Sequence, residues 1–168
     1  IQNVPDEGAP ATEKTEAWIL FDEQNIYVGG RVWDSAPPSE WVANEMRRDS
    51  NRLRLNDNFG VWFDTFYDRR NGIIINITPI GGRMDGQIAD ERDWNGDWNP
   101  IWDVRTGRFE GGWTFEAEIP FKSLRYRSRR DQIWGIQLRR TVRSKNEEAY
   151  LTRLDRGLSR GAMLQISQ

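Results

Sequence analysis

The sequence predicts an all-β fold, an antiparallel β-sandwich of jelly-roll-like type with about ten strands. Three observations support this class. Apolar and polar residues alternate with a period of two along most of the chain, as in strands with one buried face, and no stretch shows the period of an amphipathic helix. Clusters of Asp, Asn, Gly and Pro separate the alternating stretches, as turns do. Each stretch has one apolar and one polar face, as expected for two packed antiparallel sheets.

Five strands are expected in the N-terminal half, over residues 15–21, 26–34, 57–66, 73–79 and 83–90. The first two alternate cleanly and are joined by a polar turn of Asp, Glu, Gln and Asn. The third places aromatic and aliphatic residues at every second position. Asn71-Gly72 is a strong hairpin signal between the third strand and the isoleucine-rich fourth.

Four further strands are expected over residues 113–119, 132–144, 148–154 and 162–167. The first alternates without a break, and its inward residues are Trp113, Phe115, Ala117 and Ile119. A proline then begins a short turn. The long strand that follows is expected to direct Gln137 and Arg139 to the outer, solvent-facing side.

Composition excludes several classes of site. The chain has no His and no Cys, so it contains no imidazole base, no thiolate and no disulfide, and neither haem nor zinc is expected as a cofactor. A net charge of only -2 gives no reason to expect nucleic acid as a partner. The chain begins abruptly at Ile1-Gln2, so we expect residues 1–168 to be a single domain excised from a longer protein.

Three of the nine tryptophans, Trp94, Trp98 and Trp102, stand in one acidic stretch. Flat aromatic rings beside short polar side chains suit the stacking of a sugar ring, with Asn95 and Asn99 as hydrogen-bond partners of its hydroxyls. The alternative is that these rings cover the end of the core and stiffen a long loop. Trp102, which borders an alternating stretch, is the ring best placed for the core.

The same stretch spaces Asp93, Asn95, Asp97 and Asn99 two residues apart, and their oxygens are the ligands that calcium prefers. Trp98 stands where an EF-hand requires Gly, so this is not an EF-hand. An irregular structural calcium site at Asp93, Asn95 and Asp97 is one expectation. The other is a series of turns in which these side chains bond their own backbone.

Carboxylates are frequent, which raises the question of glycoside hydrolysis. Glu116 and Glu118 share one face of a predicted strand, about 7 Å apart by strand geometry. Arg139, Arg140 and Arg143 are expected as their cross-strand partners, which would lower the carboxyl pKa values rather than raise one of them. We therefore do not expect an enzyme.

Trp18, Trp33 and Trp62 are expected opposite the core on three successive strands. A solvent-facing sheet does not normally carry three indoles on one face. That face is therefore either covered by another element or domain, or it binds a ligand.

Four segments carry a resemblance to a known family: residues 15–34 (TEAWILFDEQNIYVGGRVWD), 57–64 (DNFGVWFD), 112–124 (GWTFEAEIPFKSL) and 134–137 (WGIQ). Together they resemble the pattern of family 9 carbohydrate-binding modules. The likeness is strongest to the family-9-like domain found near the N-terminus of large bacterial envelope proteins, whose remaining chain resembles an outer-membrane barrel.

The resemblance implies a β-sandwich without catalytic activity that binds a polysaccharide or oligosaccharide, often with structural calcium. It also implies that the domain is part of a larger envelope protein and that it is monomeric when isolated. Its expected location is extracellular, periplasmic or associated with the outer membrane of a Gram-negative bacterium. The alternative function is an accessory domain that docks against the rest of such a protein and binds no glycan.

Family members clamp a sugar between two tryptophans. The first position corresponds to Arg54 or its neighbours and the second to Leu154-Asp155-Arg156, and neither is aromatic here. Asn76 matches a polar residue beside the first clamp position. The resemblance therefore predicts Arg54 and Asn76 at a sugar site that lacks the aromatic clamp.

Overall fold

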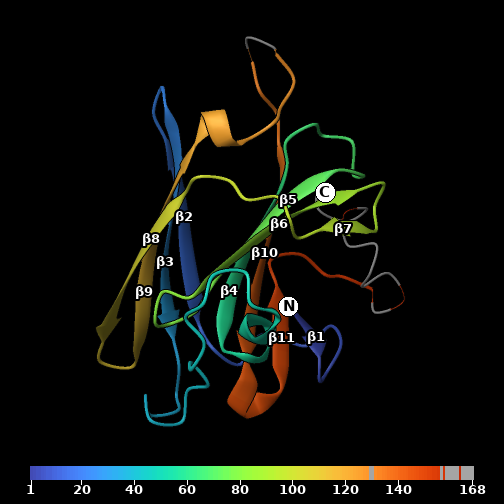
Figure 1. Ribbon diagram of the computed structural model, residues 1–168. Coiled ribbons are helices and arrows are strands. Elements are labelled where there is room, and N and C mark those ends of the chain that lie inside the picture. The colour runs from blue at the N-terminus through green and yellow to red at the C-terminus, as the bar shows by residue number, and fades with distance from the viewer. Residues whose placement is uncertain (129–130, 156, 158–162, 164–168) are drawn as a thin grey trace.

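Two antiparallel sheets face each other in the computed structural model, which describes residues 1–128, 131–155, 157 and 163 (Figure 1). The seven-stranded sheet contains, in spatial order, β1 (Gln2–Val4), β11 (Glu147–Tyr150), β10 (Gly135–Val142), β4 (Asn58–Asp64), β5 (Gly72–Ile77), β6 (Arg83–Ala89) and β7 (Asp93–Asn95). The four-stranded sheet contains β2 (Thr15–Phe21), β3 (Asn25–Trp33), β9 (Gly112–Pro120) and β8 (Asp103–Phe109). The predicted antiparallel sandwich is confirmed.

Three short 3-10 segments connect the strands: η1 (Asn51–Leu55), η2 (Phe121–Ser123) and η3 (Arg143–Lys145). None of these helices has the length or the apolar character that spanning a membrane requires.

The predicted strands agree closely with the observed ones. The strand at 15–21 has the predicted ends, and most others differ by a few residues. The strand at 132–144 is shorter, because η3 follows β10 directly and ends at Asn146, whose φ is 49°. The strand predicted at 162–167 lies outside the described residues apart from Met163. The structure adds β1, β7 and β8, and β7 lies in the stretch expected to be a loop.

The reversal between β4 and β5 differs from the predicted two-residue turn at Asn71-Gly72. Gly72 is already paired with Ile88 of β6, so the turn lies earlier in the chain. The Asp64 carboxylate accepts two loop N–H groups at 3.1 and 2.7 Å, and Asp68 accepts two more at 2.8 and 2.9 Å. Aspartate side chains thus supply the hydrogen bonds of a longer loop, which removes the need for a tight turn.

The core fills the space between the sheets. Trp113, Phe115, Ala117 and Ile119 of β9 are buried there as predicted. Phe115 packs against Phe59 of β4 with ring centroids 4.9 Å apart, so the two sheets meet through aromatic contact. Burial of these side chains, at about 25 cal/mol per Å² of apolar surface, is the main stabilisation of the sandwich.

The strand pairing corrects one expectation about the tryptophans. β3 pairs with β2 and β9, whereas β4 pairs with β5 and β10, so the strands at 26–34 and 57–66 belong to different sheets. Trp18 and Trp33 therefore lie on the outer side of the four-stranded sheet and Trp62 on that of the seven-stranded sheet. No single face carries all three indoles.

The outer side of the seven-stranded sheet is partly covered. Trp62, Ile74, Tyr150, Leu154 and Met163 form a second apolar cluster there. Gln137 lies on this side as predicted but is fully buried, because its amide donates to Thr152 Oγ1 at 2.6 Å under the segment that follows β11. The remaining part of this face is open and forms the site described next.

Candidate functional site

A hollow of about 740 Å³ lies on the outer face of the seven-stranded sheet. Its floor follows from the strand register, which aligns Arg139 of β10, Gly60 of β4, Asn76 of β5 and Met84 of β6 in one row across the sheet. The glycine has no side chain, so Arg139 can cross above it to reach Asn76. Four strands therefore contribute to one continuous floor.

Trp94 forms the accessible aromatic wall of the hollow. It is the middle residue of β7, directed opposite to its two neighbours, and 40% of its surface is exposed. The benzo edge of its indole lies against Gly86, where a Cβ would be only 2.2 Å from Cη2. The guanidinium carbon of Arg54 lies 5.0 Å from the ring centroid. A glycine on one side and a cation on the other thus fix the position of the ring.

The polar part of the floor centres on Arg139. One of its terminal nitrogens donates to Asn76 Oδ1 at 2.8 Å and to Asn58 Oδ1 at 3.2 Å. Its Nε–H and the Nε1–H of Trp62 are both buried and have no acceptor among the described residues, and the Trp62 ring centroid lies 6.0 Å from the guanidinium carbon. The centre of the floor is therefore polar, built from one guanidinium and two amide side chains.

Tyr150 closes the side of the hollow next to β11. Its ring packs edge-on against Trp62, with centroids 5.8 Å apart, and its hydroxyl donates to Glu148 Oε2 at 3.3 Å. Burial raises the pKa of Tyr150 to about 12. The protonated phenol donates its hydrogen bond to Glu148 and so holds that carboxylate at the side of the hollow.

The structure brings together three of the predicted saccharide-binding residues, because Trp94, Asn76 and Arg54 all line this hollow. Trp102 lies elsewhere: it is 3% exposed and belongs to the core. Trp98 is partly buried and packs against the same core. The expected platform of three rings is corrected to one ring, because the other two fill the space beneath the loop.

Asn95 and Asn99 are exposed but do not line the hollow. The side-chain oxygen of Asn95 accepts the N–H of Asp97 at 3.0 Å, which is the local turn bond that was the alternative to a metal ligand. In the described part of the chain, no group of three or more His, Cys, Asp or Glu could hold a metal ion. The calcium site at Asp93, Asn95 and Asp97 stays a prediction.

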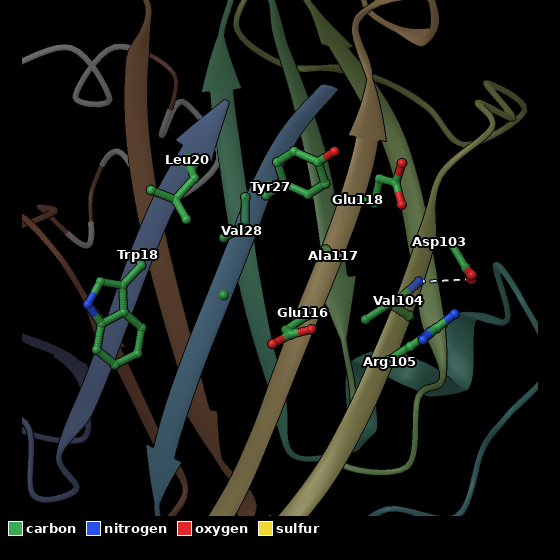
Figure 2. A pocket seen from close by; sticks show the side chains of 11 residues that line it. Trp18, Leu20, Tyr27, Val28, Asp103, Val104, Arg105, Glu116, Ala117 and Glu118 are labelled. Atoms are coloured by element: carbon green, nitrogen blue, oxygen red, sulfur yellow. Dashed lines mark hydrogen bonds between the residues drawn. The ribbon is translucent and has the colours of Figure 1, made fainter. Parts of the chain in front are cut away.

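A second hollow, of about 540 Å³, lies on the outer face of the four-stranded sheet (Figure 2). Figure 2 shows Trp18 and Leu20 on β2, Tyr27 on β3, and Glu116 and Glu118 on β9.

The strand register decides which cations can reach the two glutamates. The expected arginine partners of Glu116 and Glu118 lie on or beside β10 in the other sheet. The nearest cation across the ladder is instead Arg105 of β8, which is in register with Glu116. That expectation was wrong because strand order cannot be read from alternation alone.

The two hollows have opposite charge. The lining of the first contains three arginines and one acid, namely Arg54, Arg92, Arg139 and Glu148. The lining of the second contains three acids and one arginine, namely Asp103, Glu116, Glu118 and Arg105. Sequence reasoning missed Arg92, Arg139 and Tyr150 as site residues. Alternation predicted that Arg139 faces outward, but only the register shows that it meets Asn76.

No family model and no curated protein matches this chain. Solved structures do. A protein from Bacteroides uniformis, provisionally assigned as carbohydrate-binding, has a TM-score of 0.67 at 10% identity over 88% of this chain and 73% of its own. A family 9 carbohydrate-binding module from Caldicellulosiruptor kristjanssonii in complex with cellotriose has a TM-score of 0.57 at 14% identity, over 89% and 70% of the two chains.

A family 9 module from the same organism in complex with glucose has a TM-score of 0.55 at 16% identity, over 97% of this chain and 80% of that one. At such identities the likeness concerns the fold and not the site residues. The chain is therefore similar in fold, over most of its length, to family 9 carbohydrate-binding modules.

Proposed function

We propose that this domain binds a polysaccharide or oligosaccharide in the hollow on the outer face of the seven-stranded sheet. The observation that carries the proposal is the meeting of one accessible indole, Trp94, with the polar side chains of Asn76 and Arg54 in a hollow of about 740 Å³. A pyranose can stack its C–H face on an indole while its hydroxyls bond to neighbouring donors and acceptors. The fold supports the proposal, since two of its structural neighbours are modules in complex with cellotriose and glucose.

We propose binding without catalysis. Glycoside hydrolysis usually needs two carboxyl groups about 5–10 Å apart on either side of the scissile bond. Among the described residues that line this hollow, Glu148 is the single acid, and it accepts a hydrogen bond from Tyr150. A site of this composition can orient a sugar but lacks the pair that would cleave it.

A second candidate function is docking against another part of a larger envelope protein, and the edge strand β2 favours it. Leu20 and Phe21 are 67% and 78% exposed, and Trp18 beside them is 52% exposed. β2 pairs only with β3, so its other edge has no neighbour within the described residues. Soluble proteins normally protect such an edge with charge or a covering segment.

The experiment that separates the two functions is an affinity-gel screen over plant, algal and bacterial polysaccharides, followed by calorimetry on each positive. We expect Trp94→Ala to abolish retardation by the bound glycan. Trp18→Ala, which removes an exposed indole from the other sheet, should leave it unchanged. A domain that no glycan on the panel retards would reject the proposed function. Retardation lost in Trp18→Ala and kept in Trp94→Ala would move the site to the other sheet.

A further inference from the structure

We infer that the saccharide held in this hollow is acidic, a glycan carrying uronate carboxylates or sulfate esters. The inference rests on the proposed function and names the ligand class of the same site. Three features of the hollow carry it: the excess of arginine, the lack of acidic partners for those arginines, and the place of one of them beside the aromatic wall.

The excess of arginine stands out against the rest of the molecule. The whole chain has a net charge of -2, yet the lining of this hollow contains three arginines and one glutamate. The hollow on the other sheet has the reverse balance. A concave surface lined by one sign of charge concentrates ligands of the opposite sign.

The second feature is that these arginines have no acidic partner in the part of the chain that the structure describes. Within the described residues, no ion pair involves Arg54, Arg92 or Arg139. Arg139 donates through Nη2 to two neutral amides, those of Asn58 and Asn76, and not to a carboxylate. Some arginines elsewhere do pair with an acid, since Arg48, Arg70, Arg83 and Arg140 each contact an aspartate.

The position of Arg54 connects this charge to the sugar ring. Its guanidinium carbon lies 5.0 Å from the centroid of the Trp94 ring, so the cation is a direct neighbour of the exposed part of the indole. A guanidinium presents a planar fork of donors that matches the paired oxygens of a carboxylate or sulfate, whereas a neutral hydroxyl uses only part of it. An acidic sugar would therefore use both the aromatic plane and the fork.

The test compares two ligands with one backbone. Isothermal titration of the wild-type domain with trigalacturonate and with its fully methyl-esterified form removes the ligand charge while keeping the sugar backbone. We expect the acidic form to bind about tenfold more tightly at low ionic strength, and added salt to reduce the difference. Dextran sulfate against dextran repeats the comparison for sulfate and distinguishes the two anionic groups.

Three variants locate the effect. Arg92→Gln and Arg54→Gln should reduce the preference for the acidic trimer severalfold each, while far-ultraviolet circular dichroism remains unchanged. Arg105→Gln removes the same charge from the other hollow and should leave the preference intact. An equal loss in all three variants would indicate attraction to net charge alone and would overturn the inference.

The two failures are distinguishable. If neutral glycans bind through Trp94 as tightly as acidic ones or more tightly, the domain binds saccharide but the inference about acidity is wrong. If neither acidic nor neutral glycans bind, the proposed function falls as well.

Discussion

Gly86→Ala is the substitution that tests most closely how the indole of Trp94 is placed. A Cβ at residue 86 would stand 2.2 Å from Cη2 and 2.4 Å from Cζ2 of that ring. Carbon atoms normally approach no closer than about 3.5 Å, so the ring must withdraw by more than about 1 Å. Because β7 is short and at the sheet edge, the indole can move without opening the core.

The expected cost falls on binding rather than on folding. Alanine in a strand gains about 0.5–1 kcal/mol over glycine, which offsets the packing that Trp94 loses against the sheet. A stacking contact on a displaced ring loses about 1 kcal/mol, roughly a fivefold increase in Kd. We therefore expect a Tm within a few degrees of the wild-type value and clearly weaker saccharide binding.

Calorimetry with the glycan found in the affinity screen measures this effect. Gly29→Ala is the matched control, because it lies on the outer face of the other sheet and its Cβ would meet only the backbone oxygen of Phe115 at 3.9 Å. Wild-type affinity in Gly86→Ala would show that the position of the Trp94 ring is not part of the site. Equal weakening in Gly29→Ala would show that the effect is not local.

Three further predictions concern the rest of the molecule. Arg140 Nη2 lies 3.0 Å from Asp34 Oδ2, and Asp34→Ala leaves this buried guanidinium without that partner. The variant should lower the free energy of unfolding by about 3–5 kcal/mol in urea denaturation. Asp90→Ala, which removes the exposed partner of Arg70, should lower it by less than about 1 kcal/mol. Since the pKa of Tyr150 is raised from 10.0 to about 12, its burial contributes stability below pH 10 that is lost as the pH rises to about 12. Ultraviolet titration should show a phenol that ionises near pH 12 in the wild type and is missing in Tyr150→Phe. A calcium site at Asp93, Asn95 and Asp97 predicts a higher Tm in excess calcium than in chelator, lost in Asp97→Asn; identical Tm values in wild-type protein would reject that site.

Much of the fold could be predicted because a strand with one buried face requires apolar residues at every second position, and this alternation is visible in the sequence. β2 was predicted to the residue, since Asp22 ends its alternation and its carboxylate then accepts the N–H groups of Gln24 and Asn25 at 2.7 Å each. β7 escaped prediction because Asp93 and Asn95 are residues typical of turns. They form a strand only because β6 offers an edge to pair with, which is tertiary information.

The candidate site was predictable only in part, for a related reason. Trp102 borders an alternating stretch and was expected to be the ring best placed for the core, and it is 3% exposed whereas Trp94 is 40% exposed. The difference comes from Asp85, whose buried carboxylate accepts the indole N–H of Trp102 at 2.8 Å and so holds that ring inside. No spacing within the stretch could reveal this partner, nor that Arg139 and Asn76, 63 residues apart, meet on the same floor.

The most direct test of saccharide binding in the hollow beside Trp94 is to follow the indole N–H resonances of the nine tryptophans by nuclear magnetic resonance during titration with a bound glycan. Trp94→Phe assigns the resonance of Trp94, and Trp18→Phe assigns that of Trp18. We expect the Trp94 resonance to shift with saturation while that of Trp18 stays in place. A shift of Trp18 with Trp94 unmoved would contradict the proposed site.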